Sequence, residues 1–209
     1  MLRPSVLLYD LEIARCIPSI KEDRKPAYEY CLGWDDHAGM GISVLVAYDF
    51  PTDSVHVYCE DNVWDFAALA QRRKHIVGFN SLAFDDRVVA AYGLTVKTTW
   101  DLRMELLKRV NGDTKRHAGR RLADWLQANN LPPKTESGAR APELWQDRQY
   151  GRVIDYCVQD VMLTKRLVER LPDLVDPLTG VTVHCVPPWL EPVTDDRQLD
   201  WIAGHAVTD

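Results

Sequence analysis

The segment VLLYDLEIA, residues 6–14, carries Asp10 and Glu12 inside an otherwise apolar run. If this run is a β-strand, residues two apart project from the same face, so both carboxylates point into one small volume. Like charges at that distance destabilise each other unless a cation compensates, and a hard divalent ion takes oxygen ligands. The spacing therefore indicates a metal site. The alternative is a strand that ends at Tyr9, which would leave both acids solvated in a loop.

A second pair of residues lies in YCVQDVMLTKRL, residues 156–167, where the apolar pattern predicts a helix. Asp160 falls on the inward stripe of this helix, and Tyr156 lies one turn before it, so the tyrosine hydroxyl can reach the same place. A carboxylate aimed at a core needs a partner because burying a bare charge is costly. That partner is either a metal ion or a neighbouring basic residue. The inward stripe comprises Val153, Cys157, Val161, Leu167, Val168 and Leu171.

The segment VGFNSLAFDDRVV, residues 77–89, predicts the end of a strand followed by a helix capped by Asn80 or Ser81. In that helix Asp85 is expected on the apolar face and Asp86 is expected to turn outward. Consecutive helical residues are rotated by about 100°, so only one of two adjacent carboxylates can face a site squarely. Asp85 is therefore the fourth candidate acid, after Asp10, Glu12 and Asp160.

The elements that must position these residues alternate between short β-rich runs and amphipathic stretches, which predicts an α/β fold without internal repeats. The expected strands span 5–11, 28–34, 41–49, 54–59, 75–79 and 96–100, and the second to fourth suggest an antiparallel meander in a mixed sheet. The expected helices span 62–73, 81–92, 101–110, 119–129 and 151–171. Loops are expected at 111–118 and 132–142. One domain is predicted over residues 1–172, with a C-terminal extension over 173–209.

The composition excludes several classes of protein. The 209 residues are 46% hydrophobic, which is enough for a sizeable core. No run approaches the ~20 apolar residues of a membrane helix and the N-terminus lacks a signal-peptide pattern, so a soluble protein without a membrane partner is expected. Five dispersed cysteines without a C-x-x-C pair fit a reducing cytoplasm better than disulfides or a zinc site. A net charge of −6 argues against a protein that coats nucleic acid, but not against a local basic channel.

Three motifs follow one another along the chain: Asp10-x-Glu12, Asn80-x3-Phe84-Asp85 and Tyr156-x3-Asp160. Together they resemble the exonuclease motifs of the DEDD, or DnaQ-like, superfamily. The tyrosine of the third motif is typical of the tyrosine-bearing (DEDDy) subgroup, which includes the proofreading domains of family B DNA polymerases. The helix RRLADWLQANNL and the Lys134 loop also resemble the region of this family between the second and third motifs.

The resemblance implies an RNase H-like fold with a mixed five-stranded sheet flanked by helices. It also implies two-metal hydrolysis of phosphodiester bonds, which releases nucleoside monophosphates from a 3′ end. Tyr156 would orient the attacking water, since a phenol with a pKa of about 10 keeps its proton near neutrality. The implied catalytic residues are Asp10, Glu12, Asp85, Tyr156 and Asp160. The implied ligands of two Mg²⁺ or Mn²⁺ ions are the carboxylates of Asp10, Glu12, Asp85 and Asp160, with Asp10 bridging the ions.

Substrate contacts are expected beside these motifs. Leu11 and Asn80 adjoin motif residues and are expected to meet the terminal nucleotide, whereas Phe84 is expected in the core. Between Lys108 and Arg121 the chain is locally basic, which marks either a solvated face or a surface that holds the phosphates of the strand. The candidate strand-binding residues of this run and the next loop are Lys115, Arg116, Arg120 and Lys134.

Single-stranded DNA is the expected substrate, and two alternatives stay open. An RNA-trimming enzyme of the same fold would use the same backbone chemistry. A non-catalytic nucleic-acid-binding scaffold would keep the fold without the activity, although it has no need for clustered buried acids. The usual D-x-E-T motif has Ile13 in place of threonine, which removes a hydroxyl near the nucleotide. Because no polymerase module is recognisable, a polymerase or another replication or repair protein is a candidate partner.

Overall fold

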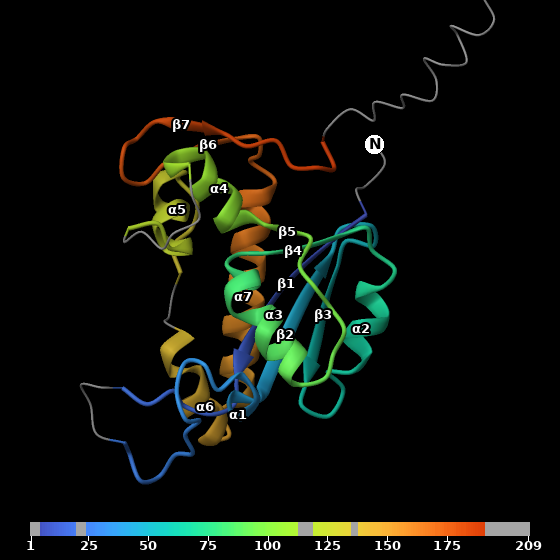
Figure 1. Cartoon of the computed structure of the whole chain (residues 1–209), viewed down its shortest axis with the longest axis vertical. Helices are drawn as coiled ribbons and strands as arrows, with labels where there is room; N and C mark the ends of the chain where they lie inside the picture. The colour runs from blue at the N-terminus through green and yellow to red at the C-terminus, as the bar shows by residue number, and fades with distance from the viewer. Residues whose placement is uncertain (1–4, 20–23, 113–118, 135–137, 191–209) are drawn as a thin grey trace, which may run out of the picture.

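A mixed five-stranded sheet forms the centre of the molecule. The computed structural model describes residues 5–19, 24–112, 119–134 and 138–190. The strand order is β3-β2-β1-β4-β5, with β1 in the middle (Figure 1). β2 pairs antiparallel with both β1 and β3, whereas β1, β4 and β5 run parallel. The strands are β1 Val6–Ile13, β2 Ile42–Asp49, β3 Ser54–Cys59, β4 His75–Gly78 and β5 Trp100–Asp101. The expected α/β fold with a mixed sheet is confirmed.

Side chains alternate along β1 between two hydrophobic cores, one on each face of the sheet. Leu8 packs in the first core, whereas Tyr9 and Leu11 pack in the second. Asp10 and Glu12 alternate with these residues and therefore continue the face of Leu8. The strand extends beyond both acids to Ile13, so neither is a loop residue.

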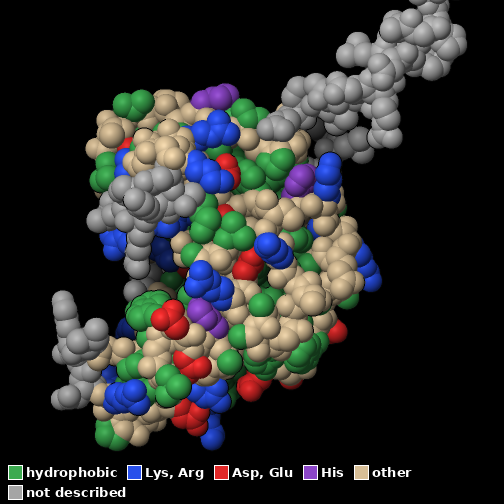
Figure 2. All heavy atoms as spheres, in the orientation of Figure 1, with side chains coloured by type: hydrophobic (Ala, Val, Ile, Leu, Met, Phe, Trp, Pro, Cys, Tyr) green, Lys and Arg blue, Asp and Glu red, His purple; other side chains and the backbone are tan. Residues whose placement is uncertain are grey.

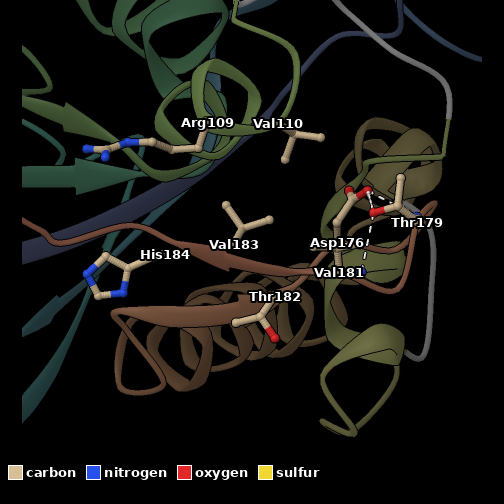
Figure 3. Close-up of a pocket in the computed structure, with 8 residues that line it drawn as sticks. All are labelled: Arg109, Val110, Asp176, Thr179, Val181, Thr182, Val183 and His184. Carbon is tan, nitrogen blue, oxygen red and sulfur yellow. Dashed lines mark hydrogen bonds between the residues drawn. The ribbon is translucent and has the colours of Figure 1, made fainter.

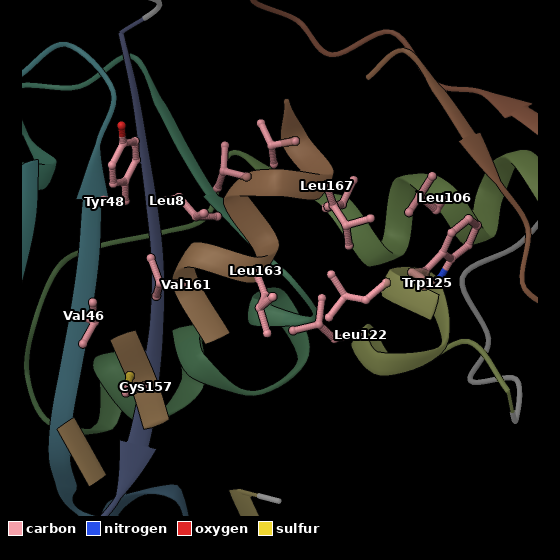
Figure 4. Packing of buried hydrophobic residues seen from close by; sticks show 14 of the residues in the cluster. Leu8, Val46, Tyr48, Leu106, Leu122, Trp125, Cys157, Val161, Leu163 and Leu167 are labelled. Atoms are coloured by element: carbon pink, nitrogen blue, oxygen red, sulfur yellow. The ribbon is translucent and has the colours of Figure 1, made fainter. Parts of the chain in front are cut away.

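The first core lies between the sheet and α7, Tyr150–Val168, which contacts β1 and β2. All residues of the expected inward stripe are buried. Figure 4 shows Val161, Leu163 and Leu167 between sheet residues on one side and two further helices on the other. These helices are α4, Leu102–Asn111, and α5, Leu122–Ala128. The helix that carries Asp160 is thus held against the sheet by packing on both sides.

The second core lies under α2, Asp65–Ala70, and α3, Asp85–Ala91. A 3₁₀ turn, η1 Ser81–Ala83, leads from β4 into α3, and the short helix α1, His37–Met40, packs against α3. The expected helix at 81–92 is therefore divided into a 3₁₀ turn and an α-helix. This division sets the direction of Asp85, the first residue of α3.

The described part of the expected C-terminal extension packs on the same body. Strands β6, Asp173–Val175, and β7, Thr182–His184, form a hairpin, and β7 lies against α4. Leu174 and Val183 of this hairpin are buried in the first core. The hairpin is therefore part of the packed structure and not a tail.

The expected strand at 28–34 is wrong. Within the described residues, this segment has only an isolated bridge between Tyr30 and Cys16. The predicted meander would place this segment beside β2, but both edges of β2 are already occupied, by β1 and by β3. The segment docks instead on α6, Ala141–Gln146, where the side chain of Gln146 accepts a hydrogen bond from the backbone N–H of Glu29.

Several boundaries also differ from expectation. The segment 132–142 is not a loop throughout, because η2, Gly138–Arg140, and α6, Ala141–Gln146, begin within it. The prediction extends the last helix to residue 171, but α7 ends at Val168, ahead of Pro172, which cannot continue a helix. The strand expected at 96–100 is reduced to the two residues of β5. Within the described ranges, no helix has the length and apolarity needed to cross a bilayer.

Candidate functional site

Three carboxylates converge on the face of β1 that α7 covers. One oxygen from each of Asp10, Glu12 and Asp160 lies within 4.8 Å of the others. β1 places the first two side by side because they are two residues apart, and α7 presents Asp160 from its buried side. Glu12 and Asp160 are only 8% and 5% exposed, while Asp10 is partly buried. We refer to these three residues as the acidic cluster.

The acidic cluster is electrostatically unfavourable without a cation. Burial raises the pKa of Asp10 well above its ordinary value, and the charges of Asp85 and Asp160 raise it further. Burial also raises the pKa of Glu12, together with the charges of Asp10 and Asp160. The pKa of Asp160 is raised by burial as well, although Lys134 opposes the shift. A bound cation would remove this strain by favouring the charged forms.

Among the described residues, Lys134 is the basic residue whose side chain contacts the acidic cluster. Its Nζ lies 2.5 Å from Asp160 Oδ2 and 5.2 Å from the centre of the Tyr156 ring. The other oxygen of Asp160, Oδ1, is buried and has no hydrogen-bond partner among the described residues. One ammonium group therefore faces three carboxylates. Lys134, predicted to bind substrate, lies at the centre of the site.

Tyr156 lies beside the same carboxylates, as expected from its position one turn before Asp160. Burial raises the pKa of Tyr156, and the charges of Asp160 and Glu12 add to this shift, so its hydroxyl stays protonated. Gly138 of η2 approaches the same point. A Cβ at Gly138 would lie 3.1 Å from the Tyr156 hydroxyl oxygen and 3.5 Å from Glu12 Oε1. The sequence analysis did not predict that Gly138 lies so close to the site. The sequence feature that could have indicated it is the glycine itself, in TESGAR, because a residue without a side chain permits close approach.

Asp85 reaches β1 from the start of α3. Its Oδ1 accepts a hydrogen bond of 3.2 Å from the backbone N–H of Leu11. This N–H needs a partner because β4 pairs with β1 only as far as Leu8. Burial raises the pKa of Asp85 to about 7, against the opposing effect of its backbone hydrogen bonds. Asp85 is thus close enough to influence Asp10, but it does not belong to the closest group of three.

The expected outward orientation of Asp86 is wrong. Asp86 is 9% exposed, and Oδ1 accepts a short hydrogen bond from the Tyr9 hydroxyl. The backbone N–H of Thr98 donates to Oδ2 at 3.0 Å, and its hydroxyl donates to Oδ1 at 2.8 Å. Both side chains are buried because Asp85 and Asp86 are the first two residues of α3. Asp85 points to the backbone of β1, and Asp86 points to the segment before β5.

The two expected nucleotide contacts have different surroundings. The Leu11 side chain is 4% exposed and packs in the second core. Asn80 has a left-handed backbone, φ 72°, and its side-chain oxygen accepts a hydrogen bond of 3.0 Å from Arg103. Its backbone N–H donates to Asp101, which also caps α4 through Met104. Asn80 therefore lies at the junction of β4, η1 and α4, and Leu11 can meet a ligand only through its backbone.

The basic run does not form one surface in the described structure. Arg120, predicted to bind the strand, is 5% exposed and pairs with Asp176 at 2.6 and 2.9 Å. Its guanidinium is therefore engaged inside the fold and not presented to a ligand. Arg121 pairs with Asp124 across one helical turn. Lys115 and Arg116 lie outside the described residues. On the face seen in Figure 2, basic and acidic side chains are intermixed.

A hollow of about 390 Å³ lies between the end of α4 and the β6–β7 hairpin (Figure 3). Its lining combines Arg109 of α4 with Asp176, which Arg120 already neutralises. None of the carboxylates of the acidic cluster lines it. The hollow is thus separate from the chemistry of the cluster.

The acidic cluster fits a hard divalent cation. Its donors are carboxylate oxygens, which Mg²⁺ and Mn²⁺ prefer, and its negative charge exceeds the charge of Lys134. Asp160 Oδ1, which has no hydrogen-bond partner in the part of the chain that the structure describes, is available for coordination. Asp10, Glu12 and Asp160 are the residues that would hold the ion.

Comparison of the chain with protein-family models and with curated proteins finds no match in either case.

Proposed function

We propose that this protein is a metal-dependent 3′-5′ exonuclease of the tyrosine-bearing DEDD type, with an RNase H-like fold, acting on single-stranded DNA. The supporting observation is that Asp10 and Glu12, near the start of the chain, converge on one point with Asp160, far along the chain. The three carboxylates carry more negative charge than the ammonium group of Lys134 can balance. The order of the motifs and the mixed sheet with β1 at its centre agree with this proposal.

The residues have separate tasks in the proposed reaction. Asp10, Glu12 and Asp160 hold the metal site, and Asp85 supports it from α3. Two Mg²⁺ or Mn²⁺ ions would supply an activated water and stabilise the charge that develops on the phosphate and the leaving oxygen. Tyr156 stays protonated and orients the water through its hydroxyl.

Lys134 has a different task, because it is a flexible cation already in the site. Its ammonium group neutralises Asp160 in the metal-free protein. With ions bound, this ammonium can turn to a phosphate oxygen of the substrate. Lys134 is therefore both a counterion and a substrate-binding residue.

The test is degradation of 5′-labelled single-stranded DNA and RNA oligonucleotides of the same sequence. With Mg²⁺, the wild-type protein should shorten the DNA one nucleotide at a time from the 3′ end, and excess EDTA should stop it. A blocked 3′ terminus should protect the strand. Preference for the RNA strand would support the RNA-trimming alternative, and internal cuts would contradict an exonuclease.

The matched variants are Asp10→Asn in the acidic cluster and Asp61→Asn at an exposed position between β3 and α2. Asp10→Asn should be inactive and Asp61→Asn should match wild type. Persistence of the activity in Asp10→Asn would show that it comes from a contaminant or from another site.

A further inference from the structure

The two edges of the central sheet differ in their protection. β5 is only two residues long, and Trp189 packs edge to face on Trp100 there, with ring centroids 5.1 Å apart. β3, at the opposite edge, is six residues long and pairs with β2 over its whole length without a bulge (Figure 1). Its sequence, SVHVYC, contains no acidic residue, lysine, arginine or proline, which commonly protect sheet edges from pairing with another chain. We refer to the outer side of β3 as the open edge.

The hydrogen bonds of Cys59 show which residues of β3 point outward. In an antiparallel pair, the N–H and C=O groups of one residue point to the same side, and successive residues alternate. The Cys59 N–H donates to Asn62 Oδ1 at 2.7 Å, and the Cys59 C=O accepts from the Asn62 N–H at 3.0 Å. Both groups of Cys59 therefore point away from β2, and so do those of Val57 and Val55. Among the described residues, no strand pairs with this side of β3.

The side chains of the same two valines add an apolar strip. Val55 and Val57 are 41% and 36% exposed. Val57 lies opposite Val46 of β2, so the strip continues the first core, on the α7 face, to the edge of the sheet. α2 covers the other face, where Phe66 packs on Tyr58. The open edge thus combines outward backbone groups with adjoining exposed apolar side chains.

The open edge is complementary to itself when a second copy is related by a two-fold axis through His56, perpendicular to the sheet. Val55 of each copy then lies opposite Val57 of the other. Because both residues point outward, each opposed pair exchanges both of its backbone hydrogen bonds, as in an antiparallel ladder. The valines of the two copies also meet on the α7 face, where cross-strand apolar pairs are stabilising.

Charge and length are also compatible with a second copy. The same register places Asp53 opposite Cys59 and Glu60 opposite Thr52 of the other copy, so no like charges oppose each other. At Cys59 the outward groups are already bound by Asn62, which ends the pairing there. The free part of the edge is therefore short and symmetric about its centre, which favours an identical strand over a longer, unrelated one.

We propose that two copies of the chain pair antiparallel through β3, so that their sheets join into one continuous sheet with both α7 helices on the same face. The inference is independent of the proposed exonuclease function. The acidic cluster stands on β1 and α7, and β2 separates it from the open edge. A single strand edge is a small interface, so the dimer is weak and dissociates on dilution.

The first test is sedimentation velocity of the full chain over a series of concentrations in reducing buffer. The mass of wild type should rise from one chain to two with concentration. Val57→Lys should keep the mass of one chain throughout, because lysine at a strand edge opposes pairing. The matched control is Val181→Lys, since Val181 is 63% exposed in the turn of the β6–β7 hairpin. That variant should dimerise like wild type, and circular dichroism should show that both variants are folded.

A second test fixes the register. His56 lies opposite His56 of the other copy, so two cysteines introduced there are within reach of a disulfide. Ser54 instead lies opposite Tyr58 of the other copy, far from its own equivalent. Under mild oxidation, His56→Cys should form a disulfide-linked dimer, whereas Ser54→Cys and wild type should not. Adding Val57→Lys to His56→Cys should abolish the link.

Four outcomes would overturn the inference. Wild type with the mass of one chain at every concentration would leave the open edge to a strand of another protein. Dimerisation of Val57→Lys would place the contact elsewhere. A disulfide-linked dimer of Ser54→Cys in preference to His56→Cys would exclude the symmetric register. Masses that grow beyond two chains would show an open-ended assembly, which a two-fold contact cannot form.

Discussion

Asp176, beside the β6–β7 hairpin, and Asp160, on α7, are buried to a similar extent but have different partners. Asp176 is 1% exposed, and both its oxygens accept hydrogen bonds from Arg120. Asp160 is 5% exposed, Lys134 donates to its Oδ2, and the Tyr156 hydroxyl also interacts with it, but its Oδ1 has no hydrogen-bond partner among the described residues. The hydrogen bonds of Arg120 lower the pKa of Asp176, whereas burial raises that of Asp160. Within the described residues, both oxygens of Asp176 therefore have hydrogen-bond donors, whereas Oδ1 of Asp160 has none.

Asp49 has the same kind of partner as Asp176, because the guanidinium of Arg73 donates to both its oxygens. Burial by itself would raise the pKa of Asp49, but hydrogen bonds from Arg73 and Thr52, together with the charge of Arg73, outweigh burial and lower it. Asp49 and Asp176 thus each receive a forked guanidinium, which provides a hydrogen-bond donor for both oxygens. Among the described residues, the three carboxylates of the acidic cluster face one lysine, Lys134. This difference is the reason to interpret the cluster as a site for cations that come from solution.

The largest expected effect separates Asp160→Asn from Asp176→Asn. Asp160→Asn should reduce exonuclease activity on the order of 10³-fold or more, because it removes a metal ligand, yet it should keep or raise stability in metal-free buffer. Asp176→Asn should lose about 3–5 kcal/mol of stability, because it leaves Arg120 buried without its charge partner. Urea denaturation and activity per folded molecule measure both effects. If Asp160→Asn unfolds while Asp176→Asn stays stable and active, then Asp160 is the structural carboxylate and this interpretation is wrong.

The second prediction concerns pH. The pKa of Asp85 is raised in the folded protein to about 7, so the folded state binds more protons than the unfolded state between pH 4 and 7. Stability contributed by the protonated form is therefore lost as pH rises through this window, by on the order of 2–4 kcal/mol. The lowered pKa values of Asp49 and Asp176 act below that window.

The measurement is the free energy of unfolding of metal-free protein at pH 4, 5, 6 and 7. Wild type should lose stability relative to Asp85→Asn as pH rises, and titrating groups that lie away from Asp85 cancel because both proteins contain them. Asp10 and Glu12 do not cancel, because the charge of Asp85 raises the pKa of both, and their contribution to the difference has the same sign. Added Mg²⁺ should restore stability at pH 7 by binding the folded state. Parallel pH curves for the two proteins would show that Asp85 titrates normally.

Asp86 offers a third arrangement, a buried carboxylate held by neutral donors from Tyr9 and Thr98. Asp86→Ala should cost about 2–3 kcal/mol, since it leaves these buried donors without an acceptor. Asp85→Ala should cost less stability and more activity. The comparison uses denaturation midpoints and initial rates of both variants. A stable and fully active Asp86→Ala would show that this network is dispensable.

The smallest expected effect belongs to Tyr156. Tyr156→Phe should slow cleavage roughly ten- to a hundredfold while folding and metal affinity stay unchanged, because one orienting hydrogen bond contributes about 1–3 kcal/mol. Its pH–rate profile should run parallel to that of wild type, since the hydroxyl stays protonated. Loss of the pH dependence in Tyr156→Phe would instead assign proton transfer to the hydroxyl.

The sequence by itself determined which residues share a face. A period of two placed Asp10 and Glu12 on one side of β1, and the apolar stripe of α7 placed Asp160 inward, because both patterns follow from local backbone geometry. The alternation of strands and helices likewise indicated the mixed sheet. None of these inferences needs knowledge of a distant partner.

Tertiary structure decided which groups meet. Asp86 is buried because the Tyr9 hydroxyl donates a hydrogen bond to it. Arg120 is not presented to a ligand because it pairs with Asp176. Gly138 reaches the site because its turn lies against the Tyr156 hydroxyl. The segment 28–34 has strand-like composition, but β1 and β3 occupy both edges of β2, beside which the predicted meander would place it. Each of these outcomes is a contact between residues far apart in the chain. Local patterns carry no information on such contacts, because their free energy exists only once the elements have packed.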